Sequence, residues 1–221
     1  MIALNNNSTR LMECYSKIIG DSLDCHTRKH CQRVAILACK FGLFLGLSPG
    51  LNNRLYAAAL VHDIGKHAID VDILGKTGVL TSRDRMILCT HSIMGYQFLT
   101  SNYALEEEIA EAVLQHHERY DGAGYPLGLA GKDILYLARI ISIVDAYDAM
   151  TNHRAYRKTL TASQALAEIL NETEKQFDPD LAREFVWNFQ KIMDIKFCPA
   201  VFFLSSDASH RALEVAQHCS G

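Results

Sequence analysis

Residues 116–126 read His-His-Glu-Arg-Tyr-Asp-Gly-Ala-Gly-Tyr-Pro, so two adjacent imidazoles open directly into a glycine-rich loop that ends in proline. Two further polar units accompany this stretch. Upstream lies His62-Asp63-Ile64-Gly65-Lys66, and downstream a segment runs from Asp145 to Arg157. Imidazoles and carboxylates are ligands for transition metals, and such metals can activate water toward a phosphodiester. The three units together predict a metal site for phosphodiester chemistry.

The spacing of apolar residues between these units has the period of a helix. Proline is scarce, at four residues, and strands are hard to place, so we predict a nearly all-α protein. Thr81 with Asp84 has the spacing of an N-terminal cap for a helix that carries His91. Gly75 and Gly78 predict a loop from residue 66 to residue 80. The other expected helices cover about residues 9–19, 23–45, 51–62, 105–118 and 134–150.

Two more helices are expected to close the bundle. Thr161 with Gln164 has the spacing of a capping box, and Asp178 is expected to cap a helix that has Pro179 at its first position.

Composition limits the class of protein. A chain of 221 residues that is 49% hydrophobic can bury one sizeable core, so a single compact domain is expected. A net charge of -3 and a pI near 6.3 argue against a nucleic-acid polymer as partner. The seven cysteines include no C-x-x-C pair, which favours a reducing cytoplasm over a disulfide framework. No apolar stretch is long enough to span a bilayer, so no membrane partner is expected.

The order and spacing of the three units resemble the HD-GYP domain family, a subgroup of the HD metal-dependent phosphohydrolases whose members typically hydrolyse cyclic di-GMP. The resemblance covers about residues 22–190 and implies an HD-type helical bundle. We therefore expect an N-terminal helical extension over residues 1–21, the HD-GYP domain over residues 22–194, and a C-terminal segment of unassigned role over residues 195–221.

The resemblance also implies a set of metal ligands, with Asp63 as a carboxylate that bridges two divalent cations. Nitrogen and oxygen donors of this kind suit iron or manganese, with zinc as the alternative. Three-metal members carry a glutamate four residues before the first histidine ligand, and here that position is His26. Two metals are therefore expected, and a third is left open. The implied ligands are His30, His62, Asp63, His91, His116, His117 and Asp145.

Four cationic or aromatic side chains are expected to act on the substrate. Lys66 is expected to stabilise charge at the scissile phosphate, so Asp63 and Lys66 are the predicted catalytic residues. Arg154 and Arg157 resemble the family's phosphate-binding segment. Tyr125 can stack on a base or hydrogen-bond a phosphate, or the Gly124-Tyr125-Pro126 loop can contact a GGDEF-domain cyclase, as it is associated with doing in the family. Two further carboxylates, Glu118 and Asp148, are candidates for orienting ligand imidazoles.

The resemblance implies hydrolysis of cyclic di-GMP to linear pGpG by a metal-bound hydroxide, with GMP as a further candidate product. One alternative keeps this chemistry and takes 3',3'-cyclic GMP-AMP as substrate, because the residues that would read guanine cannot be located in the sequence. The other alternative is a non-catalytic cyclic di-GMP sensor or a GGDEF-binding scaffold.

Overall fold

The computed structural model describes residues 17–103, 106–152 and 159–197. Most of the predicted N-terminal extension and most of the C-terminal segment lie outside the described residues, as do Arg154 and Arg157. Residues 17–22 begin the described chain with a short helical stretch, which leads into the main bundle.

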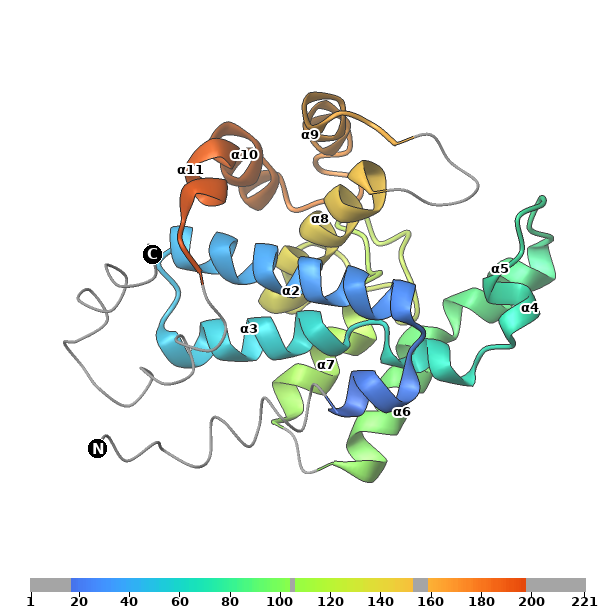
Figure 1. Ribbon diagram of the computed structural model, residues 1–221. Coiled ribbons are helices and arrows are strands. Elements are labelled where there is room, and N and C mark those ends of the chain that lie inside the picture. The colour runs from blue at the N-terminus through green and yellow to red at the C-terminus, as the bar shows by residue number, and fades with distance from the viewer. Residues whose placement is uncertain (1–16, 104–105, 153–158, 198–221) are drawn as a thin grey trace, which may run out of the picture.

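The centre of the bundle is the antiparallel pair α2 (Cys25–Phe44) and α3 (Pro49–Val61), which lie side by side in Figure 1. The N-terminus of α2 is capped by Asp24, and that of α3 by Ser48, with proline at the first helical position. The two helices approach closely at Gly42, where a Cβ would run into the side-chain oxygen of Asn52. Most of α3 is buried, as its nearly continuous apolar sequence predicts.

Helix α8 (Tyr136–Thr151) packs across both α2 and α3, and α6 (His91–Asn102) and α7 (Glu107–Gln115) complete the layer beneath them. Helices α9 (Ala162–Asn171), α10 (Pro179–Trp187) and α11 (Phe189–Asp194) close the bundle, with Phe185 of α10 in an edge-to-face contact with Phe41 of α2. The predicted capping box of Thr161 and the predicted cap at Asp178 are both confirmed.

The segment of the chain that connects α3 to α6 forms an arm, which projects from one side of the bundle in Figure 1. It begins at the 3-10 helix η1 (Ile64–Ala68) and contains α4 (Val71–Leu74) and α5 (Ser82–Cys89). The prediction of a loop over residues 66–80 was therefore wrong for part of this stretch, because the carboxylate of Asp70 caps the short helix α4.

The predicted cap at Thr81 is confirmed as a capping box with Asp84, but its helix does not carry His91. Helix α5 ends at Cys89, where the Thr90 hydroxyl donates to the carbonyl of Ile87, and His91 is the first residue of α6. The boundary of α7 also differs from the prediction. It ends at Gln115, so His116 is its C-cap residue and His117 lies beyond it.

Within the described residues the fold is all-α, with no β-strand, and it forms the single compact domain that the sequence predicts. The 3-10 helix η2 (Gly131–Asp133) lies between the glycine-rich loop and α8. None of the helices in these residues combines the length and apolar character needed to cross a membrane.

Candidate metal centre

Three histidines occupy the ends of helices that converge on one point. His62 and His116 are the C-cap residues of α3 and α7, and His91 follows the C-cap of α5. Each ring donates its Nδ1 proton to the carbonyl oxygen three residues earlier, at 2.7 Å, on Ala59, Leu88 and Val113. These carbonyls belong to the last turn of a helix, where the helix has too few N–H donors for its carbonyls. The same hydrogen bond therefore caps the helix and leaves the lone pair of each ring free on its Nε2 atom.

The Nε2 atoms of these histidines face a shared space. Nε2 of His91 lies 3.2 Å from Nε2 of His116, and the buried Nε2 of His62 has no hydrogen-bond partner within the described residues. Burial lowers the pKa of His91, and burial together with the neighbouring imidazoles holds that of His116 well below its usual value. Neutral lone pairs that face one another repel unless a cation lies between them, so the arrangement fits a metal ion.

Asp63 stands between two groups of ligand atoms. Its Oδ1 lies 3.4 Å from Nε2 of His91, while its Oδ2 lies 3.5 Å from Nε2 of His62 and 3.7 Å from Nε2 of His30. Although burial opposes ionisation, the charge of Lys66 and the neighbouring histidines hold the pKa of Asp63 well below its usual value. Oδ1 thus faces one group, whereas Oδ2 lies beside the two histidines of the other group, to which Asp63 itself belongs. In each group the ligand atoms lie within 4.8 Å of one another, and the groups are His91, His116 and His117, and His30, His62 and Asp63.

His30 reaches the same point from the second turn of α2. Its Nε2 lies 3.0 Å from Oδ1 of Asp145 on α8, and its Nδ1 lies 2.7 Å from Oδ2 of Asp148. Burial alone would lower the pKa of His30, but these two carboxylates raise it to about 9, and the same contact with His30 lowers the pKa of Asp145. A proton and a metal ion at Nε2 exclude one another, so metal binding there releases a proton.

Gly65 explains why the His62-Asp63 pair reaches His91. A Cβ at this position would run into the carbonyl oxygen of His91 and the amide of Gly95, which are backbone atoms of α6. Because glycine lacks a Cβ, η1 packs directly on the start of α6, and the two groups of ligand atoms come within reach of one carboxylate.

Lys66 lies beside the cluster, with its Nζ 2.5 Å from Oδ2 of Asp63. Burial would lower the pKa of Lys66, but the charge of Asp63 outweighs burial and raises it. The side chain is therefore a fixed cation, which suits stabilisation of negative charge better than proton donation.

The glycine-rich loop places Tyr125 against the cluster. The ring centroids of Tyr125 and His117 lie 4.9 Å apart, and the peptide bond from Tyr125 to Pro126 is cis. Gly122 adopts a φ of 78°, whereas Gly124 leaves no room for a Cβ beside the backbone of Glu118. Burial lowers the pKa of His117 to about 3, so this imidazole also is neutral.

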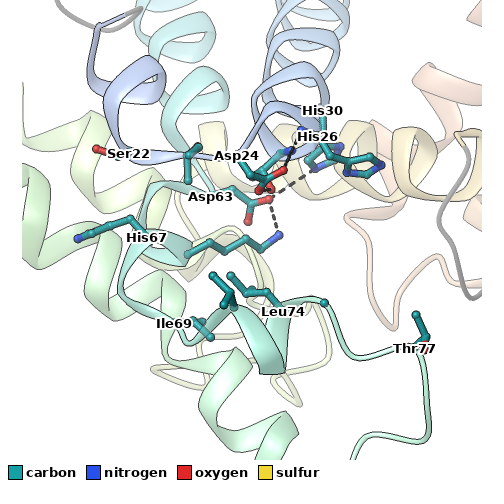
Figure 2. Close-up of a pocket in the computed structure, with 14 residues that line it drawn as sticks. Ser22, Asp24, His26, His30, Asp63, His67, Ile69, Leu74 and Thr77 are labelled. Carbon is teal, nitrogen blue, oxygen red and sulfur yellow. Dashed lines mark hydrogen bonds and ion pairs between the residues drawn. The ribbon is translucent and has the colours of Figure 1, made fainter.

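Two adjoining hollows give access to the cluster. The larger, of about 890 Å³, runs between the arm and the glycine-rich loop and is lined by Tyr125, Lys76 and Arg85 among others. The smaller, of about 590 Å³, is shown in Figure 2 and is lined by Asp24, His26 and His67 among others. The residues that both hollows share are His30, Asp63, Lys66, Leu74 and Thr77. His30, Asp63 and Lys66 therefore lie where the two hollows meet.

A family model described as HD domain matches residues 13–181. The chain belongs to the HD domain family.

Relatives and solved structures agree with this membership. A cyclic di-GMP phosphodiesterase of Thermotoga maritima is 32% identical, over 80% of this chain and 49% of the relative. A 3'3'-cGAMP-specific phosphodiesterase of Vibrio cholerae is 32% identical, over 77% of this chain and 33% of the relative. An HDG"Y"P protein from Bdellovibrio bacteriovorus has a similar fold, with a TM-score of 0.62 at 21% identity, over 74% of this chain and 52% of the other. This HD domain thus spans about half or less of the length of these relatives.

The HD domain brings all seven predicted ligands to one place, together with Lys66 and Tyr125. His26 is an exposed residue one turn before His30, on the wall of the smaller hollow. Asp148 contacts a ligand imidazole, as the sequence suggested. Glu118 instead accepts hydrogen bonds from the backbone amides of Leu127 and Leu129, which holds the glycine-rich loop, whereas Asp148 bonds His30.

Sequence reasoning missed the part of the HD domain that the arm contributes. Arg85, Lys76 and several apolar residues of the arm line the larger hollow. Their spacing matches no motif, and only a correct placement of α4 and α5 beside the cluster could have identified them.

Proposed function

We propose that this HD domain is a metal-dependent phosphodiesterase that hydrolyses a cyclic dinucleotide, with cyclic di-GMP as the first candidate and linear pGpG as its product. The observation that carries the proposal is the position of Asp63, which presents one carboxylate oxygen to each of two groups of ligand atoms at the meeting point of two hollows. The names of its relatives, several of which are cyclic di-GMP phosphodiesterases, support this substrate class.

The donor atoms favour two divalent cations on either side of Asp63. One would be held by His30, His62 and Asp145, and the other by His91, His116 and His117. Imidazole and carboxylate donors without thiolates suit iron or manganese, with zinc as the alternative. His26 lies close enough to His30 along α2 that a third ion is an outcome for metal analysis to decide. When bound, such a pair of cations activates a shared water and neutralises charge on the phosphodiester.

The remaining side chains have complementary parts in this proposal. Lys66 holds a positive charge between the two hollows, where it would stabilise the charge that develops on the scissile phosphate. Tyr125 lies on the larger hollow, where it would contact a base or a phosphate of the ligand. Arg154 and Arg157 stay predicted phosphate-binding residues. The larger hollow has a volume in the range of about 300–1,000 Å³ that small-molecule sites occupy.

The second candidate substrate is 3',3'-cyclic GMP-AMP, because several relatives are named as phosphodiesterases specific for it. A non-catalytic sensor or a scaffold that binds a GGDEF-domain protein through the Gly124-Tyr125-Pro126 loop is the alternative from another class. Both the GGDEF partner and a cytoplasmic location stay predictions from the sequence.

The test begins with anaerobic purification and metal analysis, followed by incubation with each cyclic dinucleotide under added iron(II) or manganese(II). Linear products would be resolved by chromatography. We expect about two metal ions per chain and release of pGpG from cyclic di-GMP. Protein that holds two metals and binds the dinucleotide without forming a linear product would refute the enzymatic proposal and favour the sensor.

A matched pair of variants tests the metal centre itself. His62 and His67 each donate Nδ1 to the carbonyl three residues earlier, but the ring of His67 packs on Phe98 instead of facing the cluster. His62→Gln is expected to lose metal, and His67→Gln to retain it. Equal metal content in the two variants would show that the proposed ligand set is wrong.

A further inference from the structure

His30 is held differently from the three ligand imidazoles at helix ends. His30 lies in the interior of α2, where the neighbouring backbone carbonyls are already engaged in the helix. Its Nδ1 proton therefore needs an acceptor from another element. Asp148 of α8 supplies it, with its Oδ2 at 2.7 Å from Nδ1, and this carboxylate is itself buried, at 5% exposure.

Asp148 is held in turn by two other residues. Arg33, one turn after His30 on α2, donates Nε to Oδ1 and Nη2 to Oδ2, each at 2.8 Å. Asn152, which follows α8, donates its Nδ2 to Oδ1 at 2.9 Å. Each oxygen thus accepts two hydrogen bonds, one pair from His30 and Arg33 and the other from Arg33 and Asn152. Only a carboxylate offers two acceptor atoms in this position, because an amide would turn its NH2 group against a donor.

We propose that Asp148 is a positioning residue that fixes the ring of His30 for metal binding and ties it to the end of α8. Asp148 bonds the imidazole on one side and Asn152 on the other, and Asn152 is the residue from which the chain leaves α8. The predicted phosphate-binding residues Arg154 and Arg157 follow directly in the sequence. Asp148 thereby links a metal ligand to the end of α8. This inference rests on the proposed function only in requiring that a metal binds at His30.

The first test is Asp148→Asn, measured by manganese(II) titration against a competing chelator. Loss of such a supporting carboxylate typically weakens metal affinity by about 10- to 100-fold, and we expect a loss in that range. The fall in kcat/KM should be partly recovered at saturating metal, because the ligands themselves are unchanged. A metal affinity equal to that of the unaltered protein would overturn the proposal.

Arg33→Met provides the second test, because it removes two donors from Asp148 and leaves the bond to His30. We expect a smaller loss of metal affinity than with Asp148→Asn. In the double variant, the amide at position 148 can turn its oxygen toward His30 without facing the guanidinium, so the double variant should bind metal more tightly than Asp148→Asn alone. A merely structural role predicts additive losses and no such recovery. If Asp148→Asn fails to fold, unchanged metal affinity in Arg33→Met overturns the proposal.

Asp178→Asn is the matched control. Asp178 is also a buried aspartate that pairs with an arginine, Arg139, and it accepts two backbone amides at the start of α10, away from the cluster. We expect its metal affinity to be unchanged even if its stability falls. Equal loss in Asp178→Asn and Asp148→Asn would show general destabilisation and overturn the proposal. An unaltered protein that binds metal without turnover would refute the proposed function alone, because the affinity comparison needs no activity.

Discussion

The two walls of the larger hollow are built in opposite ways. On one wall, the predicted ligands come from helices with buried cores, and His30, Asp63 and His91 are themselves almost fully buried. On the other wall, none of the described residues of α4 and α5 is buried, and Val79, which lies between these two helices in the chain, is 88% exposed. The first wall is fixed by tertiary packing, whereas the second depends on local caps and on the ion pair between Lys76 and Asp84. Changes to the two walls should therefore have separable effects, on metal binding and on substrate binding.

The largest effect is expected from Asp63→Ala on the buried wall. This change removes the one carboxylate that faces both groups of ligand atoms, so metal content should collapse and kcat/KM should fall by about 10³-fold or more, since metal ions supply several kcal/mol of transition-state stabilisation. Metal analysis and turnover measure the two losses. Full metal content with an unchanged rate would show that Asp63 is not a metal ligand and that the proposed metal centre is wrong.

Gly65→Ala should have the next largest effect, although it changes no ligand. The added Cβ would push η1 away from α6, at a cost of about 1–3 kcal/mol, and would separate Asp63 from His91. Chemical denaturation and metal analysis measure the two consequences. Gly78→Ala on the arm is the control, because a Cβ at Gly78 meets nothing within 4 Å. Similar losses in both variants would contradict the difference between the walls.

Lys66→Ala tests a residue that lies beside the cluster without being a ligand. We expect metal content to persist while kcat falls by about 10²-fold, the usual result of removing one electrostatic stabiliser. Lys76→Ala is matched to it, because Lys76 also pairs with an aspartate and lines the larger hollow, but on the arm. If Lys76→Ala lowered kcat as much as Lys66→Ala, the stabilising charge could not be assigned to Lys66 beside the cluster.

Arg85→Ala should affect substrate binding alone. Arg85 lines the larger hollow from the arm. If its charge contacts a phosphate of the substrate, KM should rise by about tenfold with kcat and metal content unchanged. Arg83, on the same helix, does not line either hollow, and Arg83→Ala is expected to leave KM unchanged. Steady-state kinetics at saturating metal would measure the difference. Loss of metal from Arg85→Ala would show that the arm also affects metal binding, against the separation of the two walls.

The smallest effect is expected from Met86→Gln. Because Met86 is largely exposed and lies outside both hollows, its replacement should change the free energy of unfolding by less than about 0.5 kcal/mol. A larger loss in a denaturation measurement would show that the arm packs more firmly than its exposure indicates.

The sequence predicted the buried wall much better than the exposed one. Apolar periodicity located α2, α3 and α8 because tertiary burial requires a continuous apolar face, and the caps at Thr161 and Asp178 follow from short-range hydrogen bonds. The ligand positions came from the family resemblance, since spacing in the chain does not reveal which imidazoles meet.

The remainder depended on interactions that a sequence does not display. The break between α5 and α6 arises where Thr90 and His91 turn their side chains onto backbone carbonyls, so His91 could not be assigned to the correct helix. Residues 66–80 of the arm were taken for a loop because the short helix α4 has no buried residue to impose a period. The different parts played by Glu118 and Asp148 were also hidden, because both are buried carboxylates near ligand histidines and only their partners distinguish them.

The ligand atoms of the cluster come from positions as far apart in the chain as residue 30 and residue 145. The two ions of the proposed metal centre would together act as reversible cross-links among the five helical segments that carry these ligands. Because the unfolded chain cannot gather these ligands, free metal at 100 times its dissociation constant would raise the free energy of unfolding by about 2.7 kcal/mol. The melting temperature of the protein should consequently rise with metal concentration. The availability of the metal would then govern the stability of the folded protein as well as the rate of the proposed reaction.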